Sequence, residues 1–393
     1  MPCALFRGLA RLLGGGALVL HAAAGAATII VGPERQPAAF AEALAKAADG
    51  DEIVLMPGTY KGATAVIEHK KLTIRGEGKT RPVIQFDGKL AAGRALFIVK
   101  GGDVQLENLE FRGARATDGD GAGVRFEAGR LRIVRCAFFE NEHGLVTGNA
   151  RDAELTVLES EFAHAPREVG RLNHLLHVGP IKHFTLSGSR LFNGFEGHLV
   201  KSRARETQLL YNMIRDGASG EASHEVDLPS GGRVTMIGNV VGQSPRSQNP
   251  VVISYGSEGK TWDDNTLVLS HNTLISEGWL PAWFLRVHRD RVPGMGEVLA
   301  LNNLIVGSGL FELGALGSGG QFTGNRPATL GMLADVVTGG FELPPDSWWR
   351  GLVPDPRQAF GRNLAPQAEF EWPLGLRTIS TDRVRWAPGA YQR

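Results

Sequence analysis

The sequence predicts an all-β protein: a single-stranded right-handed parallel β-helix with a short N-terminal capping helix and an irregular C-terminal tail. The main observation is a repeat. From about Leu72 onward, short segments of alternating apolar residues recur, and each carries a small or amide residue near one internal position. That position recurs every 23 to 33 residues, which is the period of a β-solenoid with loops of variable length. Alternation within each segment is typical of strands.

The shared position of the repeat predicts a ladder of side chains inside the coil. Equivalent residues of successive parallel rungs stack about 4.8 Å apart, so buried amides at this position can hydrogen-bond from rung to rung. We expect the ladder to stabilise the fold and give it no role in catalysis. Its predicted members are Leu109, Cys136, Ser160, Ser189, Asn212, Asn239, Asn272 and Asn303.

Both ends of the chain differ from the repeat. Residues 1–27 begin with positive charges and continue into an apolar stretch that ends in small residues, which predicts a cleaved signal peptide and a periplasmic or secreted protein. We expect the β-helix over residues 28–309, with an amphipathic helix over residues 37–48 capping its first rung. Residues 310–393 are rich in Gly and Pro and predict a tail packed on the coil.

Composition argues against two classes of partner. The chain has 42 Lys and Arg against 41 Asp and Glu, so no excess basic charge favours nucleic acid or an anionic membrane. After residue 27 no stretch approaches the roughly 18 to 20 apolar residues of a membrane helix, so we expect no membrane insertion. Cys136 is the only cysteine after the predicted signal peptide, and its apolar neighbours predict a buried packing role.

Two stretches of the sequence carry a family resemblance. The phrase GDEIVLMPGTY, followed by LTIRGEG, resembles the N-terminal region of secreted proteins of the pectate-lyase-like superfamily, and the closing APGAYQR resembles the final strand of several of them. The resemblance implies a β-helix over essentially the whole chain after residue 27. It does not imply one reaction, because the superfamily includes lyases, hydrolases, epimerases, esterases and proteins without known activity. The Asp-rich calcium strand of pectate lyases and the paired aspartates of polygalacturonases are not found, so the likeness is closest to lyases that use Lys and Arg.

Ionisable residues gather on one strand of each middle rung. The segments NHLLHVG, GHLVKSR and SHEVDLP align, and we expect them to stack as neighbouring parallel strands. Arg203 shares the strand face of Lys201, and Tyr255 and Glu258 follow on a later rung. The first predicted column is His174, His198 and His224, and the second, three residues later, is His177, Lys201 and Asp227.

This cluster suits an acidic sugar as its partner. Lys201 and Arg203 would neutralise a uronate carboxylate and so lower the cost of removing the neighbouring C5 proton. His177 or His198 would take that proton, and Tyr255 or a second histidine would protonate the departing oxygen. The sequence therefore predicts a polysaccharide lyase that acts on an acidic polysaccharide by β-elimination. The residues expected to bind the substrate are His174, His224, Asp227 and Glu258.

Other interpretations of the same residues stay open. A non-catalytic polysaccharide-binding or surface β-helix would need only polar ladders with offset charges. A glycoside hydrolase or epimerase would use Asp227 with Glu225 or Glu258. The histidines also permit a divalent metal, but their spacing matches no known metal motif, and we expect no cofactor. We expect His143, one rung earlier, to lie one place out of register. The oligomeric state is not predicted.

Overall fold

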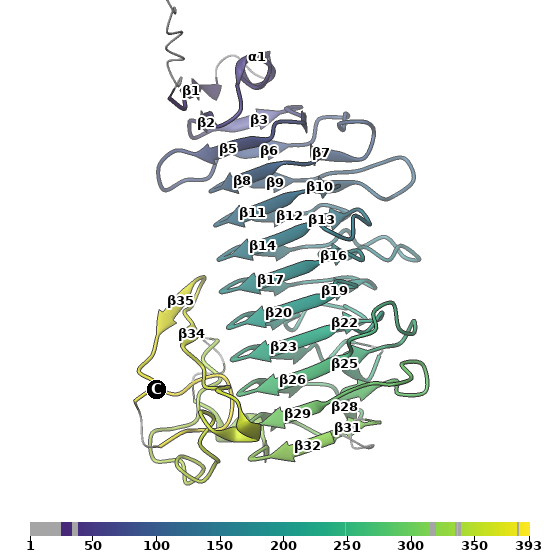
Figure 1. Ribbon diagram of the computed structural model, residues 1–393, viewed down its shortest axis with the longest axis vertical. Helices are drawn as coiled ribbons and strands as arrows, with labels where there is room; N and C mark the ends of the chain where they lie inside the picture. Colours follow the sequence, from purple (N-terminus) through teal and green to yellow (C-terminus); the bar gives the residue numbers. More distant parts are fainter. Residues whose placement is uncertain are drawn as a thin grey trace, which may run out of the picture.

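The chain folds into a long parallel β-helix. The computed structural model describes residues 25–33, 38–247, 249–314, 320–334, 336, 339–382 and 385–393. Each full rung contributes one strand to each of three parallel sheets (Figure 1). No helix within the described part of the chain is long and apolar enough to cross a membrane. Most of the predicted signal peptide lies outside the described residues.

The first two sheets meet at a tight corner. The 12-stranded sheet comprises β1 (Thr28–Val31), β2 (Glu52–Leu55), β5 (Lys71–Gly76), β8 (Asp103–Glu107), β11 (Arg130–Val134), β14 (Glu154–Leu158), β17 (His183–Ser187), β20 (Glu206–Leu210), β23 (Arg233–Ile237), β26 (Thr266–Ser270), β29 (Val298–Leu301) and β32 (Gly320–Thr323). The 11-stranded sheet comprises β3 (Thr59–Lys61), β6 (Val83–Gln85), β9 (Glu110–Arg112), β12 (Ala137–Phe139), β15 (Glu161–Ala163), β18 (Arg190–Phe192), β21 (Met213–Arg215), β24 (Val240–Gln243), β27 (Thr273–Ser276), β30 (Leu304–Val306) and β33 (Arg326–Ala328).

The third sheet has ten strands and follows the 11-stranded sheet in most rungs through longer connections. This 10-stranded sheet comprises β4 (Ala65–Ile67), β7 (Ala95–Val99), β10 (Ala122–Phe126), β13 (His143–Thr147), β16 (Leu176–Val178), β19 (His198–Ser202), β22 (His224–Leu228), β25 (Val251–Tyr255), β28 (Ala282–Val287) and β31 (Gly309–Leu313).

The ladder lies at the corner between the 12-stranded and 11-stranded sheets. The residue before each ladder member turns the chain with a positive φ, a conformation that Gly238 adopts at little cost. Asn239 Oδ1 accepts the backbone N–H and the side-chain amide of Asn212, at 3.0 and 2.9 Å. Its own amide donates to Asn272 Oδ1 at 2.9 Å and to the Leu209 carbonyl at 2.7 Å. The predicted ladder is therefore confirmed as a hydrogen-bonded interior feature.

The ladder and the coil both continue past residue 309. Asn325 Oδ1 accepts the backbone N–H and the side-chain amide of Asn303, at 2.9 and 2.8 Å. Strands β31 to β33 add a further rung that ends at Ala328.

Nearer the N-terminus, Cys136 is buried in the ladder, which agrees with its predicted packing role. Burial raises the pKa of its thiol to about 12, so the side chain stays protonated at neutral pH.

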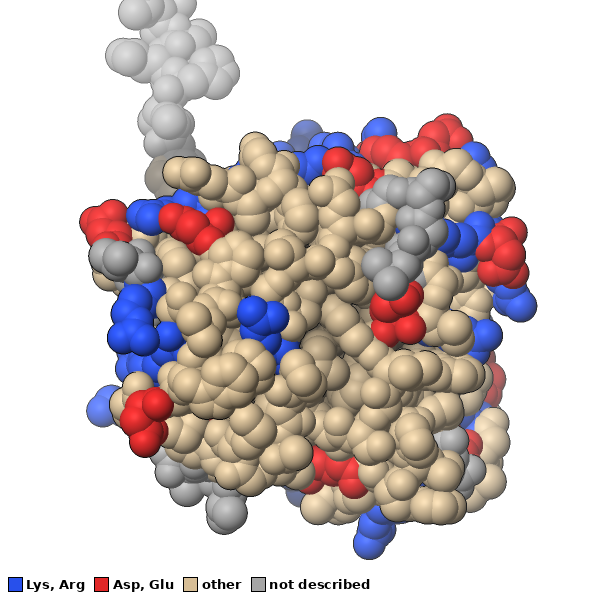
Figure 2. Space-filling model, turned by 90° about the horizontal axis from the view of Figure 1, so that it is seen from below, with Lys and Arg blue, Asp and Glu red and all other residues tan. Residues whose placement is uncertain are grey.

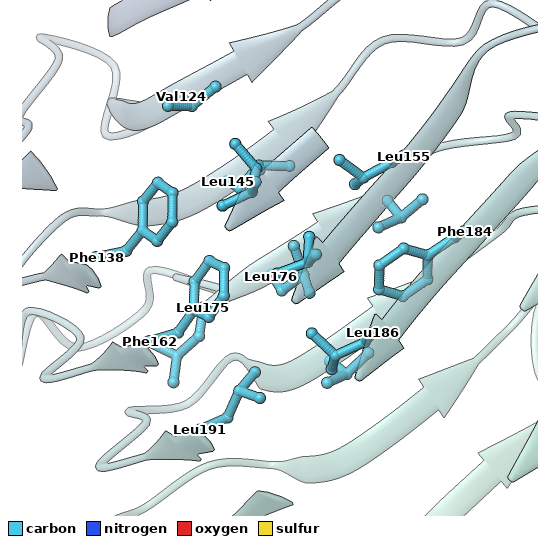
Figure 3. Close-up of a cluster of buried hydrophobic side chains, with 14 of the residues drawn as sticks. Val124, Phe138, Leu145, Leu155, Phe162, Leu175, Leu176, Phe184, Leu186 and Leu191 are labelled. Carbon is cyan, nitrogen blue, oxygen red and sulfur yellow. The ribbon is translucent and has the colours of Figure 1, made fainter. Parts of the chain in front are cut away.

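Stacked apolar side chains fill the space between the sheets. Phe138 and Phe162 stack with ring centroids 4.5 Å apart, and Leu176 lies in the same buried cluster (Figure 3). At the first rung, helix α1 (Ala38–Lys46) closes the coil because its Phe40 is buried and stacks on Phe97 at 5.3 Å. The predicted capping helix is confirmed.

The segment after Ala328 packs on the outer face of the 11-stranded sheet, beside the later rungs (Figure 1). There Phe341 and Tyr391 belong to the same buried cluster as Val240 and Leu304. Figure 2 shows the far end of the coil, where charged side chains lie mostly around the rim. The segment contains η2 (Leu330–Met332), η4 (Ala359–Gly361) and the antiparallel pair β34 (Ala368–Phe370) and β35 (Leu376–Thr378).

Candidate active site

Two columns of ionisable side chains lie on the 10-stranded sheet. His177, Lys201 and Asp227 are successive Cα partners on β16, β19 and β22. His198 and His224 are Cα partners three residues earlier on β19 and β22, with ring centroids 4.8 Å apart. The structure thus places these residues in the two columns that the sequence predicts.

His143 extends the first column, so the expectation that it would lie out of register is wrong. Its ring centroid lies 5.8 Å from that of His174, whose backbone N–H donates to His143 Nδ1 at 3.2 Å. His174 in turn accepts the backbone N–H of His198 at Nδ1, at 2.9 Å. The loop between the ladder and this column changes length from rung to rung, so spacing from the ladder did not reveal the register of His143.

Burial keeps four imidazoles of the columns uncharged at neutral pH, those of His174, His177, His198 and His224. It lowers the pKa of His177 to about 3, that of His198 to about 2 and that of His224 to about 4. Burial also lowers the pKa of His174 well below its usual range, and the neighbouring imidazoles add to this. A neutral imidazole has one unprotonated ring nitrogen, so these residues are in the protonation state that a general base needs, and their lowered pKa values also make them weaker bases than a free imidazole.

A charged network adjoins the second column. Lys201 Nζ lies 3.3 Å from Glu258 Oε1 and 3.7 Å from Asp227 Oδ2. Arg203 holds Glu258 with two hydrogen bonds of 2.8 Å, and its Nη1 lies 2.7 Å from His177 Nε2, a hydrogen bond that the guanidinium donates. Arg203 lowers the pKa of Glu258, whereas burial raises the pKa of Asp227. The two carboxyl groups that contact Lys201 therefore differ in acidity.

A cleft of about 600 Å³ opens beside the second column, and His177 and Arg203 lie in its wall. Sequence reasoning missed Arg125 and Glu127, which pair across 2.6 Å in the same wall. The strand register could have revealed Arg125, because this residue lies two rungs before His177 in the second column. The other lining residues are Asp120, Val146, Thr147, Gly148, Asn149, Gly179 and Pro180.

Two residues predicted for the site lie inside the coil instead. The Tyr255 hydroxyl donates to the Gly232 carbonyl at 2.7 Å, and burial raises the pKa of this fully buried side chain. Glu225 is also fully buried, and burial raises its pKa well above the usual range. Neighbouring residues of a strand point to opposite faces, and Tyr255 follows the outward Ser254. Tyr255 therefore cannot protonate a substrate on the outer face. Glu225 is two residues from Asp227, where simple alternation would put it on the same face, but its full burial prevents it from acting there with Asp227.

Hydrogen bonds occupy several imidazole nitrogens of the columns. Backbone N–H groups donate to Nδ1 of His143 and of His174, and Arg203 donates to Nε2 of His177. Within the described part of the chain, no group of three or more His, Cys, Asp or Glu side chains is arranged to hold a metal ion. That the protein works without a cofactor remains a prediction.

Comparison with known proteins identifies the architecture. No protein-family model matches the sequence, and no curated protein matches it. Among solved structures, pectate lyase Pel9A is similar with a TM-score of 0.63 and 14% identity, over 94% of this chain and 97% of that one. The fold is a pectate-lyase-like parallel β-helix. A PL6 family polysaccharide lyase, Pedsa3628 from Pseudopedobacter saltans, aligns at a TM-score of 0.40 and 13% identity, over 81% of this chain and 96% of that one.

Proposed function

We propose that this pectate-lyase-like β-helix cleaves a uronate-containing polysaccharide by β-elimination, in the cleft beside the second column. The observation that carries the proposal is the 2.7 Å contact between Arg203 Nη1 and His177 Nε2 in the cleft wall. It puts a cation for the carboxylate and a neutral base for the adjacent C5 proton within reach of one sugar ring. The structural likeness to a pectate lyase supports a polysaccharide as the substrate.

The same contact couples substrate binding to the base. A uronate carboxylate that takes the Nη1 donor of Arg203 frees the lone pair on His177 Nε2. His177 then removes the C5 proton, a C4–C5 double bond forms, and the C4–O bond breaks with its electrons on the departing oxygen. Arg203 and Arg125 stabilise the negative charge that builds on the carboxylate during proton removal. Lys201, one rung from His177 and hence about 4.8 Å away along the coil, supplies the proton to the departing oxygen.

A second candidate function is hydrolysis by Asp227 and Glu258. The observation that favours it is the opposite shift of their pKa values beside the shared Lys201 ammonium. Carboxyl groups pushed apart in this way divide into a general acid and a general base. Asp227 would protonate the leaving oxygen, and Glu258 would activate water. Hydrolysis yields reducing ends without a new double bond.

The test incubates the full chain with uronate-containing polysaccharides and follows both ultraviolet absorbance and new reducing ends. We expect absorbance from the C4–C5 double bond to rise on at least one polymer, and His177→Ala to slow it about 100-fold or more. The matched control is His183→Ala, a partly buried histidine on the 12-stranded sheet, which should keep the native rate. Full activity in His177→Ala overturns the assignment of the base. Reducing ends without absorbance favour hydrolysis, and neither signal favours a binding protein.

Two further parts of the proposal concern location and cofactors. We propose export to the periplasm or the exterior on the basis of the N-terminal sequence pattern, which N-terminal sequencing of the mature chain checks.

We also propose that the elimination needs no metal, because Arg203 and Arg125 are placed to neutralise the carboxylate. Equal rates with a chelator and with added divalent metal are the expected result, and loss of activity with the chelator would contradict it.

A further inference from the structure

The cations in the cleft are largely neutralised by the protein itself. Arg125 pairs with Glu127 at 2.6 Å, and Arg203 pairs with Glu258 at 2.8 Å. Lys201, behind them, contacts Glu258 as well. A polymer with a carboxylate on every sugar would bring several charges into this cleft, where each new ion pair must compete with an existing one. The cleft therefore suits one uronate better than a run of them.

Beyond Lys201, the cations of the second column are widely separated. At the rim, the Arg151 guanidinium stacks over Trp262, 4.7 Å from the ring centroid. Further along the second column the next cation is Arg286, over Trp283 and three rungs beyond Lys201, which is about 14 Å along the coil. This spacing exceeds the separation of carboxylates on neighbouring sugars of a polymer. The second column thus offers positive charge at intervals and not continuously.

A second hollow of about 510 Å³ borders the first column on the opposite side from the cleft. Leu172, Ala222 and Pro250 give it apolar surface, and Asn249 adds an amide that lies 3.1 Å from His224 Nε2. Its Arg246 faces Glu221 at 3.5 Å, so this cation is also neutralised. Glu196 adds a carboxylate to this lining. Apolar surface with amide, hydroxyl and carboxylate groups suits an uncharged sugar ring better than a uronate.

We infer that the substrate is a heteropolysaccharide in which single uronates alternate with uncharged sugars, and not a polyuronate. One uronate binds at Arg203 and Arg125 in the cleft, and an uncharged sugar of the same chain occupies the hollow at Asn249. The inference rests on the proposed function, because it names the substrate class of the same site. It follows from charge pairing and cavity lining, which do not depend on which residue is the base.

The test compares initial rates on two groups of polymers at equal uronate concentration. Polygalacturonate and alginate carry a carboxylate on every sugar, whereas hyaluronan and unsulfated chondroitin alternate a uronate with an acetylated amino sugar. We expect ultraviolet absorbance to rise at least tenfold faster on the alternating polymers. Equal or faster cleavage of the polyuronates overturns the inference and leaves the lyase proposal standing. No cleavage of any polymer overturns both.

A variant of the hollow gives an independent readout. Asn249→Ala removes the amide beside His224 and should raise KM for an alternating polymer severalfold, with a smaller change in kcat. Thr235→Ala, on the outer face of the 12-stranded sheet, is the matched control and should leave both constants unchanged. Native KM in Asn249→Ala would show that no sugar occupies the hollow and would overturn this part of the inference.

Discussion

The interior ladder and the outer columns use the same stacking geometry with opposite chemistry. In the ladder, identical amides follow each other, and Asn239 satisfies both its donor and its acceptor with Asn212 and Asn272. In the columns, unlike groups follow each other, so that His177, Lys201 and Asp227 are neighbours. Within the described part of the chain, His198 Nδ1 and Asp227 Oδ1 are buried without a hydrogen-bond partner.

This difference means that the ladder stabilises the fold, whereas the columns lower its stability. A buried polar group with all its partners stabilises a fold, whereas a buried group without them lowers stability. In the columns, burial lowers the pKa of His198 and raises the pKa of Asp227, because the charged form of each group would lose hydration there. Such perturbed groups beside a cleft are typical of functional sites. Three substitutions test the contrast.

The largest effect on stability is expected inside the ladder. Asn239→Ala removes the acceptor of the Asn212 backbone N–H and the side-chain donor to the Leu209 carbonyl, and both groups are buried, so we expect a loss of about 3 to 5 kcal/mol in the free energy of unfolding. Denaturant unfolding measures it. The control Thr235→Ala lies on the same rung but outside the coil and should change the free energy by less than about 0.5 kcal/mol. Similar losses of stability in both variants would show that the ladder does not contribute more to stability than the outer face of the coil.

A substitution of Glu225 is expected to raise the stability of the folded chain at neutral pH, by less than the loss expected for Asn239→Ala. Burial raises the folded pKa of Glu225 well above the ordinary value, so the folded chain keeps a proton that the unfolded chain releases above about pH 4.5. The stability that the protonated acid contributes is therefore lost as pH rises from about 4.5 through the folded pKa, by about 1.4 kcal/mol for each pH unit. Glu225→Gln stays neutral and should be more stable than the native chain at pH 7 but not at pH 4.

Melting temperatures of the native chain and of Glu225→Gln at both pH values check this expectation. Asp216 provides a second probe, because burial raises its pKa to about 6, with hydrogen bonds from the backbone N–H groups of Gly194 and Ala222 opposing the shift. Glu225 also feels the charge of Asp216, so the two groups titrate together. A stability difference that does not grow between pH 4 and pH 7 would show that Glu225 is ionised in the folded chain.

The smallest effect is expected on the outer face of the 12-stranded sheet. There Arg130 pairs with Asp103 at 3.1 Å, and their side chains are 66% and 49% exposed. Exposed ion pairs are screened and gain little over their hydrated partners. Arg130→Ala should therefore lower the free energy of unfolding by less than about 1 kcal/mol, and less again in high salt. A salt-independent loss above that value, measured by denaturant unfolding, would mean that this face contributes to stability in the way the ladder does.

The sequence predicted the residues that form the columns, but it did not predict which side chains of the same strands point into the coil. The repeat predicted which residues of β16, β19 and β22 stack, because strand pairing between rungs is regular. It did not predict that Tyr255 points inward, since the alternation was not followed from the outward Asp227 to its partner Ser254. It also missed Arg125, because the strand that carries it has no histidine to mark its register.

By itself, the sequence determined the β-helix, its capping helix and its amide ladder. These features depend on local alternation and on a period set by one rung, both of which are visible in one dimension. Only the tertiary structure decided the register of His143, the burial of Tyr255 and Glu225, and the contact between Arg203 and His177. Each of these depends on loops of unequal length and on which strand face meets solvent, and those are properties of the assembled coil.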